Sequence, residues 1–197
     1  YTGTGVDQDD QEAVTWALKG AKLGSEVAES AFYICLDMCG DEPEMYDVIG
    51  VNVEEVEAYL LGLAEGGNDE AALELGKFYS SDWHGRENPK LAVKWLRATA
   101  GKEHDSVFKG ASMFRLGRYY EEGYGVRKNY KQCFKWYLQA AEAGTSIAID
   151  DVYRCYRDGV GVDKNPEEAE KWAKKHEEIY GYEIDELDDD QEESDEE

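Results

Sequence analysis

Residues 116–126, which read LGRYYEEGYGV, decide the fold, because residues 152–162 repeat their pattern as VYRCYRDGVGV. Each copy has an apolar residue at its first position, a tyrosine at its fifth and Gly-x-Gly-Val at its end. A glycine directly after a helical pattern is typical of a helix C-terminus followed by a short loop. The two stretches therefore predict repeated helices that end in the same glycine-rich exit.

A second periodic segment alternates with the first. Large aromatic residues mark it at intervals of 43, 36, 41 and 36 residues: Trp16, Tyr59, Trp95, Trp136 and Trp172. Seven residues before each stands a short polar residue: Asp9, Asn52, Asn88, Asn129 and Asn165. Asparagine and aspartate suit the N-cap of a helix, and a small residue three positions before each aromatic shares its helical face. The segment therefore predicts a second helix whose aromatic residue fills the gap to a neighbouring helix.

Together the two segments predict units of two antiparallel helices that stack on one another, because such a unit cannot bury its apolar face alone. We therefore expect an all-α fold, a right-handed superhelical solenoid of antiparallel helix pairs. Residues 9–182 form the predicted repeat domain, with about four helix pairs after a leading half repeat. Residues 1–8 are an N-terminal extension, and residues 183–197 are an acidic tail that we expect to be disordered.

The pattern Leu116-Gly117-x-x-Tyr120-x-x-Gly123-x-Gly125-Val126, followed by Trp136, Ala140, Ala141 and Gly144, resembles the Sel-1-like repeat, a relative of the tetratricopeptide repeat. The resemblance covers residues 9–180 and is weaker from residue 25 to residue 68. Residues 40–51 depart from it, since an acidic insertion replaces the Gly-x-Gly-Val exit. The resemblance implies an adaptor or scaffold that assembles or regulates other proteins, and it implies no substrate.

Charge is spread unevenly along the chain, whose formal net charge is −24. Residues 1–80 hold 18 acids and 3 bases, residues 81–182 hold 16 acids and 18 bases, and residues 183–197 hold 11 acids and no base. Direct binding of nucleic acid needs a concentrated basic surface and is not expected. A basic protein would instead be attracted, unless the acids serve only solubility. No apolar run is long enough to span a membrane.

No enzyme, metal or cofactor site is expected. Cys35, Cys133 and Cys155 occupy packing positions of the repeat, and Cys39 falls where later repeats have glycine, so we expect reduced, structural thiols and a cytoplasmic location. The three histidines, His84, His104 and His176, match no zinc spacing. No nucleophile, base and orienting group can be named together. The acid pairs Glu121-Glu122 and Asp150-Asp151 are interpreted as solvated.

The first helix of each pair holds the candidate partner-binding site, because the resemblance implies that these helices line a concave face. Corresponding positions along them carry bases and a neighbouring aromatic, which form a predicted cationic stripe: Lys77, Arg118, Arg154, Arg157 and Phe114. In tetratricopeptide relatives a similar placement clamps the carboxylates of an acidic peptide. The alternative is that these bases pair with Glu74, Glu121, Glu122 and Asp150 and serve only solubility.

Binding of a peptide or protein segment in this groove is the first function that the sequence suggests. An acidic inhibitor or immunity-type protein, which covers a basic partner such as a toxin or nuclease, is the alternative. Its predicted acidic face comprises Asp41, Glu42, Glu44, Asp47, Glu54 and Glu55. An unrecognised hydrolase is a minor alternative. For the tail, residues 185–197, we hypothesise that it folds back and occupies the basic groove. The alternative is that it captures a basic partner or only keeps the chain soluble.

Overall fold

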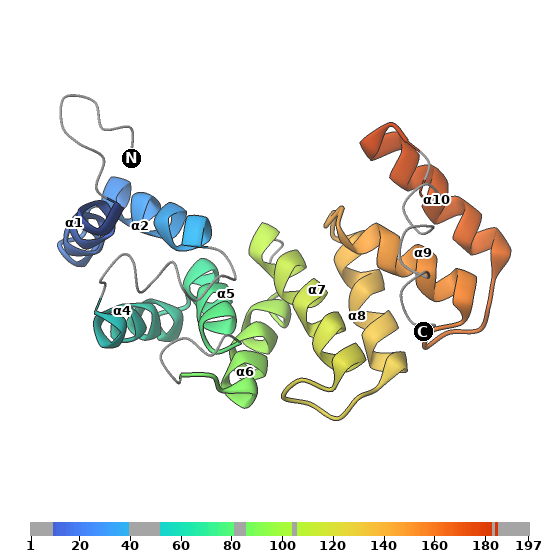
Figure 1. Ribbon diagram of the computed structural model, residues 1–197, viewed down its shortest axis with the longest axis horizontal. Coiled ribbons are helices and arrows are strands. Elements are labelled where there is room, and N and C mark those ends of the chain that lie inside the picture. Colours follow the sequence, from blue (N-terminus) through green and yellow to red (C-terminus); the bar gives the residue numbers. More distant parts are fainter. Residues whose placement is uncertain (1–9, 40–51, 81–85, 104–105, 183, 185–197) are drawn as a thin grey trace, which may run out of the picture. The chain divides into compact units, whose positions relative to one another are not determined.

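The computed structural model of the protein describes residues 10–39, 52–80, 86–103, 106–182 and 184. Over these residues the chain is helical and contains no strand (Figure 1). The helices are α1 (Asp10–Lys22), α2 (Glu26–Cys39), α4 (Val53–Glu65), α5 (Asp69–Phe78), α6 (Pro89–Ala100), α7 (Val107–Glu122), α8 (Tyr130–Glu142), α9 (Ala148–Asp158) and α10 (Pro166–Tyr180). None of these helices combines the length and the apolar character that crossing a membrane requires.

The chain divides into two compact units, residues 1–95 and residues 96–197. The boundary between them falls inside α6. Both are built from the alternating helices that the repeat pattern predicts. The prediction of an all-α solenoid is therefore confirmed. The right-handed superhelix concerns the path of the whole chain and stays a prediction.

Asparagine N-caps start the second helix of each pair, as the spacing predicts. The side chains of Asn52, Asn88, Asn129 and Asn165 each accept a hydrogen bond from the backbone N–H three residues later, at 3.1–3.2 Å. Pro166 follows directly as the first residue of α10, where a missing N–H removes no helical hydrogen bond. Asp9 lies outside the described residues. Asn68 and Ser106 cap α5 and α7 in the same way, which the pattern did not predict.

Glycines end the first helices of the second unit, and this prediction is confirmed. Gly123 follows α7 with φ 84° and Gly159 follows α9 with φ 79°, a left-handed conformation that side chains with a Cβ rarely adopt. The N–H of each glycine donates to the carbonyl of the residue four positions earlier. Each helix therefore stops at a defined residue, and the loop that follows leaves it in a fixed direction.

In the first unit α1 packs on α2 and α4 packs on α5. The ring of Phe32 on α2 lies edge-on to Tyr59 on α4, with centroids 5.6 Å apart. Lys22 on α1 forms an ion pair of 2.7 Å with Glu55 on α4. The helices of this unit are therefore joined by an aromatic contact and by a charge pair.

The ring of Trp16 is exposed, which differs from the prediction. The period predicted that its ring fills a gap between helices, but Trp16 is 61% exposed. Its indole N–H donates to Glu12, and Lys19 lies over the ring, so these polar neighbours hold it on the outer face of α1. Its counterpart Trp95 is buried, as predicted.

The second unit places α7 beside α8, α8 beside α9 and α9 beside α10 (Figure 1). Its fully buried residues come from all four helices and include Leu116, Cys133, Tyr137, Ala140, Ile149, Val152, Cys155 and His176. Gly117 lets α7 approach α8 closely, because a Cβ at this position would lie 2.4 Å from the ring of Tyr137. The small residues of the repeat therefore serve close packing of neighbouring helices.

The thiols of Cys133 and Cys155 lie inside this core and are hydrogen-bonded to each other. That hydrogen bond and burial both raise the pKa of Cys133, which suppresses the thiolate that reacts with alkylating agents. We expect both thiols to resist iodoacetamide in the folded protein and to react once guanidinium unfolds it, with mass spectrometry of peptides identifying each site. Equal labelling rates with and without denaturant would contradict this packing.

Candidate functional site

Arg118 is the most exposed base of the predicted cationic stripe. Its side chain is 54% exposed and lies 3.2 Å from Glu122, one turn later on α7. Exposed pairs of this spacing contribute only about 0.3–0.5 kcal/mol, so a partner can displace the glutamate at small cost. Phe114 lies one turn before Arg118, half-buried, with its ring 5.7 Å from that of Tyr137. Together they present a cation and part of an aromatic ring on one face of α7.

Arg154, on α9, has a different environment. Its guanidinium contacts Glu121 of α7 at 2.9 Å and Asp151 of its own helix at 3.0 Å. The hydroxyl of Tyr137 on α8 donates to the same Glu121 carboxylate at 2.8 Å. One carboxylate therefore joins three helices, and Arg154 is held in place by two acids.

The interpretation of the acid pairs as solvated was wrong for Glu121 and Asp151. Their side chains are 24% and 23% exposed, and both bind Arg154. Burial opposes the charged form of Glu121, but hydrogen bonds from Arg154 and Tyr137 outweigh it and lower its pKa. For Asp151 burial prevails over the contact with Arg154, and its pKa is raised. Position on a helix surface did not reveal that a neighbouring helix covers both carboxylates.

Lys77 and Arg157 complete the predicted stripe. Lys77 belongs to the first unit and forms an ion pair of 2.7 Å with Glu74, one turn earlier on α5. Arg157 lies 3.0 Å from the carboxylate of Asp158 and over the ring of Tyr153. Three of the pairings weighed in the alternative are therefore present, with Glu74, Glu121 and Glu122, and Asp151 and Asp158 also form ion pairs with bases of the stripe. The continuous stripe across both units stays a prediction.

The predicted acidic face is described at only two of its residues. Glu54 contacts Arg86 at 2.6 Å, and Glu55 contacts Lys22 at 2.7 Å. Asp41, Glu42, Glu44 and Asp47 lie outside the described residues. Bases of the chain itself therefore offset the two acids that can be placed.

Of the three histidines, His84 and His104 lie outside the described residues. His176 is buried on α10, with its Nδ1 3.2 Å from the carbonyl oxygen of Tyr182 and its Nε2 3.4 Å from Asp150. No cluster of three His, Cys, Asp or Glu side chains suited to a metal occurs in the described part of the chain. Ile184, at the start of the predicted tail, is buried, and residues 185–197 are outside the description.

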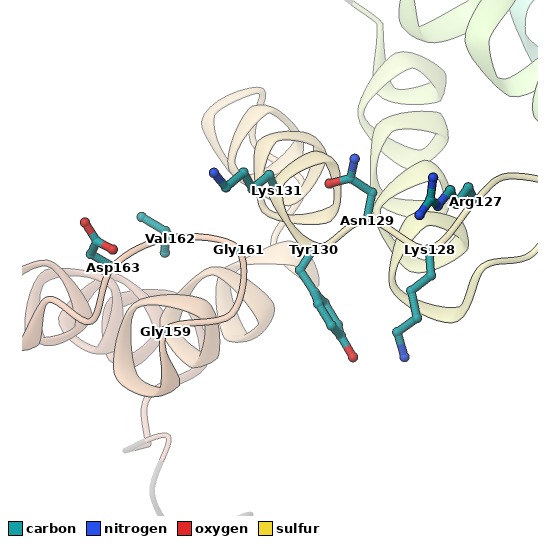
Figure 2. Close-up of a pocket in the computed structure, with 9 residues that line it drawn as sticks. All are labelled: Arg127, Lys128, Asn129, Tyr130, Lys131, Gly159, Gly161, Val162 and Asp163. Carbon is teal, nitrogen blue, oxygen red and sulfur yellow. The ribbon is translucent and has the colours of Figure 1, made fainter.

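A pocket of about 830 Å³ lies in the second unit, where the loop after α9 meets the start of α8 (Figure 2). Arg127, Lys128, Asn129, Tyr130 and Lys131 line one side of it. The loop residues Gly159, Gly161, Val162 and Asp163 line the other. Lys128 lies over the ring of Tyr130, and a hydrogen bond to the tyrosine raises the pKa of this lysine.

None of the pocket's basic residues was predicted as a site. A signal was present in the sequence, since residues 127–135 contain four bases and no acid in a chain whose net charge is −24. The Gly-x-Gly-Val exit predicted only the end of a helix and a short loop, and no binding site. The contact between the exit after α9 and the start of α8 depends on tertiary packing, which the repeat spacing does not reveal.

Comparisons with known proteins agree with this architecture. The family model for the Sel1 repeat matches residues 1–25, 69–103, 110–145 and 154–175, which together exceed half of the chain. The crystal structure of a Sel1 repeat protein from Oxalobacter formigenes is 29% identical, with a TM-score of 0.56, over 66% of this chain and 93% of that one.

A protective antigen with an SLR fold, present in uropathogenic Escherichia coli strains, has a TM-score of 0.67 at 22% identity. That match covers 90% of this chain but only 35% of the antigen, and it supports the fold alone. Comparison with curated protein sequences finds no match. Proteins built from Sel1 repeats generally act as scaffolds for protein interactions. By its repeats and its helix pairs, this chain belongs to the Sel1 repeat family.

Proposed function

We propose that the chain is a scaffold that binds a peptide or protein segment across the exposed face of α7 and α9. The observation that carries the proposal is a repeated one: Arg118 on α7 and Arg154 on α9 occupy the same repeat position, and Phe114 lies one turn before the first. Arginine and aromatic side chains are enriched where proteins bind one another. Arg157 extends this face along α9. On α5 of the first unit, Lys77 occupies the repeat position that Arg118 and Arg154 occupy.

The two arginines contribute differently in this proposal. Arg154 is bound to two carboxylates and keeps α7 and α9 in register, so it shapes the face. Arg118 has one exposed partner and can exchange it for an acid of the incoming segment. Specific contact with the partner is therefore assigned first to Arg118 and Phe114.

A cytoplasmic location belongs to the same proposal. Cys35, Cys133 and Cys155 are free thiols, as expected in a reducing compartment, where disulfides are rare. The chain is proposed to act by binding and not by catalysis.

The test is a pull-down from an extract of the native cells with the full chain as bait, followed by mass spectrometry. We expect Arg118→Glu to reduce capture of the specific partner about fivefold, since a rim charge that becomes repulsive costs about 1 kcal/mol. Lys174→Glu is the matched control, because Lys174 forms the same exposed pair one turn apart, with Glu170 on α10. It makes the same change in net charge and is expected to leave capture unchanged.

Equal loss of capture by the two variants would contradict the proposed face. A basic partner that both variants retain, and that about 0.3 M salt releases, would instead favour the acidic inhibitor, because screening weakens exposed charge contacts. In that case Glu54→Gln and Glu55→Gln are the next variants to test. Partner identity then decides between the two functions.

A further inference from the structure

The pocket at the start of α8 is lined by three bases, although the chain as a whole is strongly acidic. Three of its lining residues, Arg127, Lys128 and Lys131, come from the stretch of four bases without an acid. The side chains of all three are exposed. Figure 2 shows Lys128 and Tyr130 extending together from the helix start, with Arg127 and Lys131 on either side of them.

The positive charge of this pocket is offset less than that of other bases in the chain, although Asp163 is part of its lining. Arg127 and Lys131 form no ion pair with any of the residues that the structure describes. Lys128 contacts the ring and hydroxyl of Tyr130, which leave its positive charge intact, and the carboxylate of Glu121 also acts on this charge. Arg86 and Arg154, by contrast, are each bound to two carboxylates. Arg127 and Lys131, which have no ion-pair partner within the described ranges, can therefore bind an anionic ligand.

Backbone contact between the two walls fixes the shape of the pocket. At Gly161, where φ is 74°, an added Cβ would lie 2.0 Å from the carbonyl oxygen of Tyr130. The loop after α9 is therefore seated directly on the first turn of α8. The exposed ring of Tyr130 and the half-exposed Val162 add apolar surface beside the bases. On the loop side of the pocket, the carboxylate of Asp163 can accept a hydrogen bond from an N–H group of a ligand.

We propose that this pocket binds a short acidic peptide segment of a partner protein, with carboxylates on Arg127, Lys128 and Lys131 and an apolar side chain against Tyr130. The site lies on the loop edge of the repeats and is distinct from the α7–α9 face proposed above. Its volume, about 830 Å³, falls within the range typical of organic ligands and exceeds what a single small anion fills.

Charge favours a peptide over nucleic acid in this pocket. A nucleic acid extends its phosphates over a long path, and most of this chain repels them. A short peptide meets only the local charges, since at about 0.1 M salt the Debye length is about 10 Å and more distant acids are screened.

The probe is a fluorescein-labelled peptide, Glu-Glu-Tyr-Glu-Glu, titrated with the full chain at about 0.1 M salt and followed by fluorescence anisotropy. We expect saturable binding that the double variant Arg127→Glu/Lys131→Glu weakens about tenfold. The double variant Lys171→Glu/Lys174→Glu is the matched control, because it reverses two exposed lysines of α10 and gives the same net charge. It is expected to change the affinity less than about twofold.

Three results would overturn the proposal: no binding by the unmodified chain, equal loss in the two double variants, or tighter binding of a labelled oligothymidylate of equal charge. Thermal unfolding of both variants checks that each stays folded, and Arg127→Gln/Lys131→Gln provides a neutral intermediate. Arg118→Glu, which reverses one charge of the α7–α9 face, is expected to weaken peptide binding less than Arg127→Glu/Lys131→Glu does. A failure of this pocket is therefore distinguishable from a failure of the α7–α9 face.

Discussion

Gly117→Ala is expected to lower the free energy of unfolding of the second unit by about 2 kcal/mol. The added methyl group would lie 2.4 and 2.5 Å from two carbons of the Tyr137 ring. The ring has no room to move aside, because Tyr137 is fully buried and its hydroxyl is bound to Glu121. Overpacking typically costs about 1–3 kcal/mol, which outweighs the gain of about 0.5–1 kcal/mol that alanine brings to a helix.

Guanidinium denaturation followed by far-ultraviolet circular dichroism measures this difference. Gly62→Ala on α4 is the control, because a Cβ at Gly62 meets no atom within 4 Å. That variant is expected to be more stable by about 0.5–1 kcal/mol, through helix propensity alone. If Gly117→Ala were stabilised to the same extent, close packing of α7 on α8 would be wrong.

Arg154→Met is expected to cost about 2 kcal/mol at pH 7, because it leaves two partly buried carboxylates without their cation. The value is at the low end for charged hydrogen bonds, since the Arg154 side chain is 34% exposed and water screens part of the interaction. Arg118→Met is the control, since its exposed pair with Glu122 predicts a loss below about 0.5 kcal/mol.

The loss should shrink as the pH falls from 7 to 5. In the unmodified protein the pKa of Glu121 is lowered, so its stabilising contribution is complete above its usual pKa of 4.5 and disappears as the pH falls through the lower folded value. The pKa of Asp151 is raised, so its protonation at falling pH favours the folded state. Without Arg154 burial acts more strongly on both groups, although the hydrogen bond from Tyr137 still opposes it at Glu121, and the folded variant takes up protons at higher pH.

Denaturation of Arg154→Met and of the unmodified protein at pH 7 and pH 5 measures this dependence. We expect the difference in unfolding free energy to be smaller at pH 5 than at pH 7. A difference that stays constant or grows toward pH 5 would show that Arg154 acts through packing of its carbon chain and not through the two carboxylates.

The parts of the fold that depend on local sequence were predictable. Asn129 caps a helix, Gly123 ends one and Ala169 is buried, each at the position that the repeat spacing gives. These features follow from backbone hydrogen bonding and from helical periodicity, which act within a few residues. The prediction that the ring of Trp16 is buried was wrong, because burial of a ring depends on what packs against it. Periodicity shows which face of the helix a residue lies on, but not which element packs against that face.

The candidate sites were predictable only in part. Repeat position placed Arg118 and Arg154 on corresponding helices, but it could not show that one keeps an exposed partner while the other is bound by two acids. That distinction depends on Glu121 of α7, whose carboxylate accepts a hydrogen bond from Arg154 of α9. The basic pocket requires Tyr130 and Gly161 to be in contact, and these residues belong to different repeats. Sequence spacing therefore found the elements and missed the contacts between them.

The seating of Gly161 on the carbonyl of Tyr130 bears on how such a protein can be shortened or extended. The exit loop of one repeat packs on the second helix of the repeat before it, so the loop is part of the earlier repeat's boundary. Cutting the chain before Gly159 would leave the first turn of α8 uncovered, whereas a cut after Val162 keeps that turn covered. Whole repeats should therefore be exchanged at the end of the Gly-x-Gly-Val segment, so that each module contains both the exit loop and the helix start on which this loop packs.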